Sequence, residues 1–344
     1  MNIYNGMTRE TLRELLTKLQ TVRIGVFGDL CLDIYWHADM RLSELSRETP
    51  HFAMPVVEER ILLGGGGNVA ANMAALKPGR VLASGTAGRD WRGAELFRLM
   101  GELGIETEFI VCETGLITNA FCKPLRKGIS DTVYEDPRLD FANTAPLGEA
   151  AEDALIASLD AMAARVDVLC VSDQLPSNVC GAVTRRAREH ILKLARDGLT
   201  VIADSRDRIG LYKGVILKPN EVEAARAVAG AETALDHAAA ALVLSRRQDS
   251  EVILTAGAQG SFCAANGTVT HIPARTVTGP IDIVGAGDTF LSGLALAIAA
   301  GAARPEAAYF AGLCSEVAIQ KIGMTGTASA EEIWTWHDRT DGRK

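Results

Sequence analysis

The most informative segment of the sequence is a glycine-rich turn that is followed at once by an aspartate and an apolar helical pattern. Gly285, Ala286 and Gly287 precede Asp288 within the stretch Asp282–Phe290. Free backbone N–H groups at the beginning of a helix bind anions, so this turn suits a phosphate or the charge that develops during phosphoryl transfer. A carboxylate beside such a site is explained if it accepts the proton of an attacking hydroxyl. The alternative is a simple helix N-cap after an ordinary turn.

Two segments nearer the N-terminus carry groups suited to binding a polyol. Four glycines precede Asn68 in Gly64–Asn72, where the backbone can approach a ligand closely and the amide can bond hydroxyls. Asp33 follows a predicted strand, and its carboxylate can accept hydrogen bonds from two hydroxyls. The alternative for Gly64–Asn72 is a flexible turn capped by Asn68. The alternative for Asp33 is an exposed loop acid. Neither a Rossmann fingerprint nor a P-loop motif occurs in the chain.

Two further motifs follow short apolar runs in the second half of the chain. Asn220 and Glu223 have the spacing of a helix capping box, and the same pair could order Mg²⁺ and its waters near phosphates. The two roles are compatible. Thr255, Gly257 and Gly260 form a glycine-containing turn that suits either a tight hairpin or a loop facing a nucleotide.

Alternating strands and helices are predicted to position these motifs. The strand candidates are Arg23–Gly28, Val166–Ser172, Thr200–Asp204, Gly214–Leu217 and Glu251–Thr255. The helix candidates between them are Glu149–Ala164, Ala182–Asp197, Glu221–Ala229 and Thr233–Ser245. Apolar strands separated by helices predict βαβ units and a mostly parallel sheet with helices on both faces. Ligands of such sheets bind beyond the carboxyl ends of the strands.

Two regions depart from this alternation, at about 34–60 and 117–141. Both are more polar and less helical, and they contain alternating apolar patches such as Phe121–Leu125. Because long loops in compact domains usually have a function, we expect these excursions to form a small β lid on a single domain that spans residues 1–344. Long surface loops are the alternative.

Composition limits the class of protein. The 344 residues are 48% hydrophobic and carry a formal net charge of −8, which argues against a general nucleic-acid binder. No two of the seven cysteines form a CxxC pair, so we expect reduced, buried packing residues rather than disulfides or zinc ligands. No signal peptide or membrane span is evident, which predicts a soluble, cytoplasmic protein.

The five motifs, in this order and spacing, resemble the ribokinase-like PfkB family of carbohydrate kinases from about Arg23 to Ile333. The resemblance implies a doubly wound α/β/α sandwich with a small β lid. It implies that Asp288 is the catalytic base and that Gly285, Ala286 and Gly287 form the anion hole around the transferred phosphoryl group. Acceptor contacts are implied for Asp33, Gly65 and Asn68.

The same resemblance implies ATP as co-substrate and Mg²⁺ as cofactor. The residues that match the family's nucleotide and Mg²⁺ motifs are Asn220, Glu223, Thr255, Gly257 and Gly260. Glu223 would hold Mg²⁺ through water. Some members of the family also bind K⁺, for which the candidates here are Asp282, the backbone of Val284, and Gly323.

Within the family the sequence is most similar to bacterial heptose-7-phosphate kinases. The similar pieces are Gly28–Trp36, Ser46–Pro50, Pro55–Val57, Gly64–Ala71, Arg138–Phe141, Ser172–Asp173 and Lys321–Gly323. Arg138 is then a candidate for contacting an anionic group of the acceptor, with a solvated lid arginine as the alternative. The chain departs from the pattern at Thr118–Asn119, where Thr-Lys is expected, and at Gly312, where many members have Asn near the adenine.

Three other functions fit part of the pattern. An aromatic-lined acceptor pocket would favour a nucleoside kinase, and the 5% aromatic content mildly disfavours it. A non-catalytic nucleotide- or sugar-binding regulator on the same fold would be expected to lack Asp288 or the glycines, and both are present. A dehydrogenase is disfavoured because the chain lacks the glycine-rich fingerprint for dinucleotide binding. A homodimer through the lid is compatible with the open edges of a small sheet.

Overall fold

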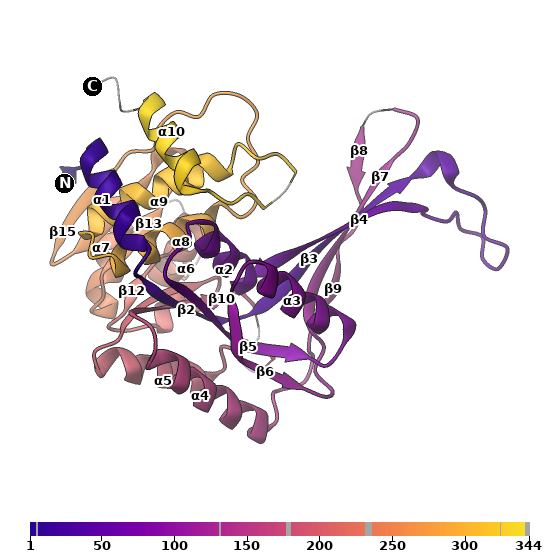
Figure 1. Ribbon diagram of the computed structural model, residues 1–344, viewed down its shortest axis with the longest axis horizontal. Coiled ribbons are helices and arrows are strands. Elements are labelled where there is room, and N and C mark those ends of the chain that lie inside the picture. Colours follow the sequence, from indigo (N-terminus) through magenta and orange to yellow (C-terminus); the bar gives the residue numbers. More distant parts are fainter. Residues whose placement is uncertain (5, 131, 177–179, 231–235, 324, 341–344) are drawn as a thin grey trace.

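A computed structural model describes residues 1–4, 6–130, 132–176, 180–230, 236–323 and 325–340 (Figure 1). Its α-helices are α1 (Arg9–Leu19), α2 (Gly66–Ala75), α3 (Trp91–Glu102), α4 (Glu149–Ala163), α5 (Arg185–Arg196), α6 (Glu221–Ala229), α7 (His237–Gln248), α8 (Ala286–Ala299), α9 (Arg304–Ala318) and α10 (Ala330–Thr340).

The strands of the large sheet, in chain order, are β1 (Asn2–Ile3), β2 (Arg23–Gly28), β5 (Arg80–Gly88), β6 (Glu106–Glu113), β10 (Val168–Asp173), β11 (Thr200–Ser205), β12 (Ile216–Leu217), β13 (Val252–Thr255), β14 (Ser261–Ala265) and β15 (Thr268–Ile272). They lie in the order β1-β15-β14-β13-β12-β11-β10-β2-β5-β6. All neighbouring pairs are parallel except β13 with β14 and β14 with β15. The prediction of a mostly parallel sheet is therefore confirmed.

Helices cover both faces of this sheet because successive strand residues point to opposite sides. In β10, Cys170 packs into a core with α1, α2, α8 and α9, whereas its neighbours Leu169 and Val171 pack into a second core with α4, α5, α6 and α7. In β2, Val26 and Phe27 are divided in the same way. Strands buried on both faces are continuously apolar, which is why the sequence runs identified them.

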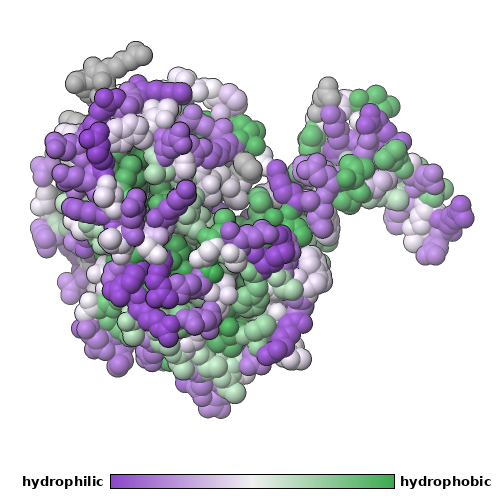
Figure 2. All heavy atoms as spheres, in the orientation of Figure 1, coloured by the Kyte–Doolittle hydropathy of each residue, from purple (hydrophilic) through white to green (hydrophobic). Residues whose placement is uncertain are grey.

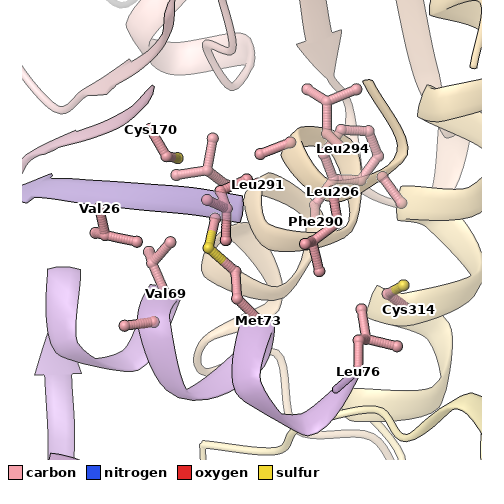
Figure 3. Close-up of a cluster of buried hydrophobic side chains, with 14 of the residues drawn as sticks. Val26, Val69, Met73, Leu76, Cys170, Phe290, Leu291, Leu294, Leu296 and Cys314 are labelled. Carbon is pink, nitrogen blue, oxygen red and sulfur yellow. The ribbon is translucent and has the colours of Figure 1, made fainter. Parts of the chain in front are cut away.

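The packing of α2 against α8 brings the two glycine-rich segments together. Figure 3 shows Val69 and Met73 of α2 facing Leu291 of α8, with Val26 of β2 nearby. All four side chains are fully buried. This apolar contact holds the N-terminal ends of the two helices in one place, where the glycine-rich segments lie.

A second, five-stranded sheet forms an arm that projects from the body (Figures 1 and 2). Its strands are β3 (Leu30–Asp39), β4 (Val56–Gly65), β7 (Asn119–Lys127), β8 (Val133–Glu135) and β9 (Leu139–Phe141). The central strand β3 pairs with β4 in antiparallel and with β7 in parallel orientation. We refer to this sheet as the lid sheet.

The boundaries of most predicted elements agree with the structure within a few residues. The predicted helix Thr233–Ser245 corresponds to α7, and its first three residues lie outside the described part of the chain. The predicted strand Gly214–Leu217 is shorter, since Gly214 has a left-handed backbone. Sequence patterns alone did not identify β14 and β15, whose antiparallel pairing closes one end of the sheet.

All seven cysteines are free, and five of them are buried. Cys112 and Cys180 are only partly buried. None of the described helices is both long enough and apolar enough to cross a membrane.

Replacing Leu291 with alanine should destabilise the fold by about 2–5 kcal/mol, because a fully buried leucine in a close-packed contact leaves a cavity. Urea denaturation followed by circular dichroism would measure the change. The matched control is Leu211→Ala, since Leu211 is 51% exposed and its removal should change stability by only about 0.5 kcal/mol. Equal losses in both variants would contradict this account of the core.

Candidate active site

The beginning of α8 has the geometry expected of an anion site. Gly285 is the N-cap residue and has a φ of 79°, a left-handed conformation that favours glycine. A Cβ at this position would lie 3.1 Å from Nδ2 of Asn68. Ala286 and Gly287 begin the first turn, where backbone N–H groups have no partner within the helix. The N–H of Ala286 donates to the carbonyl of Ile283 at 3.1 Å, in the loop before the helix. The helix N-terminus therefore presents its partial positive charge to the crevice.

Asp288 is the third residue of α8 and not its N-cap, so the simple capping role is wrong. Its Oδ2 accepts a hydrogen bond of 2.7 Å from Nδ2 of Asn68. Burial raises the pKa of Asp288 to about 6, and the nearby carboxylates of Asp204 and Asp33 add to the rise. The amide of Asn68 and the ammonium of Lys218 oppose it. A carboxylate with a pKa near neutrality suits a general base, because it can both accept and release a proton.

A chain of hydrogen bonds fixes the orientation of Asn68. Thr289 Oγ1 donates to Asn72 Oδ1 at 2.8 Å, and Asn72 Nδ2 donates to Asn68 Oδ1 at 3.1 Å. Since the carbonyl oxygen of Asn68 is thereby occupied, its NH₂ group must face Asp288. Asn72 and Thr289 were not among the residues predicted from the sequence, although both lie within the motifs that were.

The predicted acceptor contacts lie where the lid sheet joins the body. Asp33 is on β3, and its carboxylate lies so close to Gly64 that a Cβ there would be 3.2 Å from its Cγ. Gly65 has a φ of 53°, and a Cβ would lie 2.5 Å from the carbonyl oxygen of Asp29. This turn therefore requires glycine for backbone reasons, independently of any ligand.

Charged side chains gather at the carboxyl ends of the strands opposite α8. Lys218 follows β12 and is buried, with its Nζ 3.4 Å from Oδ2 of buried Asp204. A Cβ on Gly287 would be 3.7 Å from the same Nζ, so the ammonium group points at the predicted anion hole. Burial acts to lower the pKa of Lys218, but Asp204, Glu223 and Asp288 outweigh it and raise the pKa. Lys218 is therefore a buried cation, and the sequence reasoning missed it.

Asn220 and Glu223 form the capping box that their spacing predicted. Oδ1 of Asn220 accepts from the backbone N–H of Glu223 at 2.9 Å, and Oε2 of Glu223 accepts from the N–H of Asn220 at 2.8 Å. Burial, followed by the charge of Asp204, raises the pKa of Glu223 to about 7. A carboxylate held in this way is a suitable outer ligand for a hydrated cation.

A cavity of about 420 Å³ lies between the loop that follows β13 and the beginning of α8. Its lining includes Thr255, Gly257 and Gly260 on one side and Ala286 and Gly287 on the other. The size and the mixed polar and apolar lining suit a small ligand such as a nucleotide. Gly260 has a φ of 89°, and a Cβ would collide with the backbone of β15. Gly312 also lines the cavity, and a Cβ at this position would lie 3.5 Å from Nη2 of Arg275.

The three residues predicted for potassium lie together beside the predicted anion hole. Asp282 accepts hydrogen bonds from the backbone N–H groups of Val284, at 3.0 Å, and Gly323, at 2.9 Å. The carbonyl of Gly323 accepts a hydrogen bond from the guanidinium of Arg60, which belongs to the lid sheet.

Arg138, the predicted contact for an anionic group of the acceptor, is paired with an acid of the lid sheet. Its guanidinium donates to the carboxylate of Asp140 through hydrogen bonds of 2.6 and 2.7 Å.

Comparison with known proteins shows the family of the chain. The family model described as "pfkB family carbohydrate kinase" matches residues 32–331. The bifunctional protein HldE of Caulobacter vibrioides is 33% identical over 311 residues, which are 89% of this chain and 62% of that protein. The chain thus spans less than two thirds of the length of that curated relative.

Solved structures share the fold. Phosphofructokinase-2 of Escherichia coli, in complex with substrates and products, aligns with a TM-score of 0.72 at 19% identity, covering 93% of this chain and 99% of that one. Ribokinase of Arabidopsis thaliana, complexed with ribose and ATP, aligns with a TM-score of 0.66 at 18% identity, covering 92% and 98%. The predicted ribokinase-like α/β/α fold is therefore confirmed.

Replacing Asn68 with alanine should raise the pKa of Asp288 above its value of about 6, because the amide stabilises the ionised carboxylate. Titration of the aspartate side-chain carbons by ¹³C NMR would measure this, with the Asp288 signal assigned from its loss in Asp288→Asn. The control is Asn143→Ala, whose amide bonds only the backbone of Ile117. An unchanged or lower pKa would show that the hydrogen bond does not tune the carboxylate.

Proposed function

Because the chain belongs to the pfkB family of carbohydrate kinases, we propose that it transfers the γ-phosphoryl group of ATP to a hydroxyl of a sugar or sugar phosphate. Asp288 is the general base in this proposal, and Gly285, Ala286 and Gly287 form the anion hole. The observation that carries it is the position of Asp288 in the first turn of α8, with a pKa of about 6 and a hydrogen bond to Asn68.

The proposed reaction moves one proton and one phosphoryl group. The carboxylate of Asp288 accepts the proton of the acceptor hydroxyl as that oxygen forms a bond to the γ-phosphorus. The bond between this phosphorus and the oxygen of ADP breaks on the opposite side. Negative charge develops on the transferred phosphoryl group. The N–H groups at the beginning of α8 and the ammonium of Lys218 stabilise this charge.

The acceptor and the nucleotide occupy opposite sides of α8 in this proposal. Asp33, Gly65 and Asn68 lie on the acceptor side, and Thr255, Gly257 and Gly260 lie in the cavity on the nucleotide side. ATP is proposed because the ribokinase relative binds it and because this cavity meets the anion hole at Ala286 and Gly287.

Mg²⁺ is proposed as the cofactor, with Asn220 and Glu223 near the phosphates. The carboxylate of Glu223 fits the role, since oxygen donors suit Mg²⁺ and the capping box holds the side chain in place. When bound, the ion neutralises phosphate charge. K⁺ fits less well. Its candidate ligand Gly323 already accepts from the cationic Arg60, and two cations at one carbonyl repel each other.

A heptose 7-phosphate is one acceptor within this class. The similarity of several segments to heptose-7-phosphate kinases and the relatives named HldE support it. Asn119 stands where those kinases are expected to have lysine, and its side-chain oxygen is buried with no hydrogen-bond partner in the described part of the structure.

Purified protein should release ADP from Mg-ATP only when a suitable acceptor is present, and Asp288→Asn should lower the rate by roughly 10² or more. The measurement is a coupled ADP assay over sugars, sugar phosphates and nucleosides. Asp197→Asn is the matched control, because Asp197 is an exposed residue at the end of α5.

The possible outcomes separate the alternatives. Turnover with nucleosides alone would identify a nucleoside kinase. ATP binding without turnover on any acceptor would favour a regulator. Full activity of Asp288→Asn would show that another group is the base.

A homodimer through the lid sheet is also proposed. Val57, Phe52 and Tyr134 of the arm are apolar or aromatic and at least half exposed, and Figure 2 shows such groups along its surface. Exposed apolar groups on an arm with open sheet edges favour association. Sedimentation velocity should show a dimer that Val57→Lys converts to a monomer, while Leu103→Lys, on the body, does not. A monomeric wild-type protein at micromolar concentration would refute it.

A further inference from the structure

A second cavity, of about 450 Å³, lies outside the candidate active site, among three helices (Figure 1). Its lining comes from α1, from the last residues of α2 and from the beginning of α10. It shares no lining residue with the cavity of about 420 Å³ beside α8, which is proposed for the nucleotide. The volume is in the range of cavities that bind small molecules.

The floor of the second cavity is apolar. Leu76 is buried, and Leu16 and Trp334 are half-buried and pack against the main core. Ala75 completes the apolar part of the lining. Such a floor favours a ligand with a ring or a hydrocarbon part, because apolar surface of both partners is removed from water when they meet.

The rim of the second cavity carries two cations and one acid. Arg13 lines it from α1, Lys77 from the end of α2 and Glu331 from α10, and all three residues are exposed. None of the three forms an ion pair within the part of the chain that the structure describes. The guanidinium of Arg13 lies over the ring of Trp334, with Cζ 5.4 Å from its centre. The rim is therefore net positive, although the whole chain has a formal net charge of −8.

Lys77 stands at a backbone position that usually carries glycine. Its φ is 53°, and its N–H donates to the carbonyl of Ala74 at 2.9 Å, just after the last turn of α2. A left-handed residue after a helix is most often glycine, because a side chain there is strained. Local structure thus gives no reason for a lysine at this position, whereas a cationic rim does.

Helix α2 connects the second cavity to the candidate active site. Ala75 and Leu76, at its C-terminal end, line the cavity, and Asn68, in its first turn, donates to Asp288. The helix has ten residues and is therefore about 15 Å long. Because a packed helix is a stiff element, a ligand that holds one end of α2 also restrains the other end.

Helix α10 gives a second connection. Ser329, just before α10, lines the second cavity, and three residues earlier the carbonyl of Gly326 accepts from Thr289 Oγ1 at 3.3 Å. Farther along the helix, Nε1 of Trp336 donates to Oε2 of Glu316 at 2.7 Å, and Glu316 lines the nucleotide cavity. The helix that forms one wall of the second cavity thus contacts a wall of the nucleotide cavity.

We infer that the second cavity binds a small phosphate monoester with an apolar ring, and that this binding raises the affinity of the nucleotide site. Arg13 and Lys77 hold the phosphate, since charge-assisted hydrogen bonds to phosphate are among the strong ones. The ring packs on the floor beside Trp334. A ligand that bridges α2 and α10 favours the arrangement in which both helices contact the candidate active site. The binding part is independent of the proposed kinase function, and the regulatory part rests on it.

The probe is phenyl phosphate, and the measurement is calorimetric titration of the purified full chain. Wild type should bind the probe with a Kd of about 0.1–1 mM. Arg13→Gln and Lys77→Gly should each weaken binding about tenfold, because each removes a charge-assisted contact. Inorganic phosphate, which has no ring, should also bind about tenfold more weakly. The absence of saturable binding of phenyl phosphate up to about 10 mM would overturn the inference.

The variant Lys77→Gly separates a ligand contact from a structural role. Glycine is favoured at a left-handed position after a helix, so this variant should keep or raise the midpoint of thermal unfolding while it loses the probe. The matched control is Lys18→Gln, because Lys18 is an exposed lysine in the last turn of α1 that does not line the cavity. It should bind phenyl phosphate as wild type does. Unchanged binding by Lys77→Gly would show that the probe binds elsewhere, and the assignment would be wrong.

The regulatory part is tested with a non-hydrolysable ATP analogue, so that no acceptor and no turnover are needed. Because coupling between two sites is reciprocal, saturating phenyl phosphate should lower the Kd of the analogue about fivefold, and the analogue should lower the Kd of phenyl phosphate by the same factor. Neither effect should occur in Lys77→Gly. A Kd of the analogue that phenyl phosphate leaves unchanged or raises would refute the regulatory part.

Failure of this inference can be told apart from failure of the kinase proposal. If the chain releases ADP with a sugar acceptor but does not bind phenyl phosphate, the kinase stands and the second site is wrong. If no acceptor turns over while Lys77→Gly weakens the binding of phenyl phosphate, the second site stands and the kinase proposal fails.

Discussion

The hydrogen bond from Asn68 to Asp288 is the contact on which the arrangement of the site depends. It joins the first turns of α2 and α8, two helices more than 200 residues apart in the sequence, over a closely packed apolar contact. The bond sets the electrostatic state of the carboxylate as well as its position. Burial pushes Asp288 toward the neutral form, and the amide limits the rise of its pKa to about 6.

Three carboxylates and one ammonium group lie close together at this site. The four groups lie at the end of β11 (Asp204), after β12 (Lys218) and in the first turns of α6 (Glu223) and α8 (Asp288). Each is partly or fully buried. A buried ammonium among three carboxylates remains charged, while the carboxylates share its stabilisation and have raised pKa values. Such a cluster costs stability in the empty protein, and it is suited to receiving the phosphates of a nucleotide with their cation.

The lid sheet contributes a second set of charges, and its face toward the body differs from its outer face. Asp33, Tyr35, Arg60 and Lys123 share one face of the lid sheet, from which Arg60 reaches Gly323 of the body. The tip of the arm exposes apolar groups. The hydrogen bond from Arg60 to Gly323 connects this sheet to the loop that precedes the proposed anion hole. The lid sheet and the proposed transfer site are therefore linked by a direct contact as well as by the chain.

The sequence alone determined the fold class and the motifs at the phosphoryl-transfer end. Strands such as Arg23–Gly28 are continuously apolar because both faces are covered, and Gly285 is required by a left-handed backbone, so local patterns reveal them. The contacts of Lys218, Arg60 and Lys123 depended on the tertiary structure. Nothing in the local sequence distinguishes them from other lysines and arginines. Their contacts are made with residues on strands that are distant in the sequence. Strand register placed two cations beside Tyr35, and it is register, with the packing of α2 on α8, that short-range patterns do not encode.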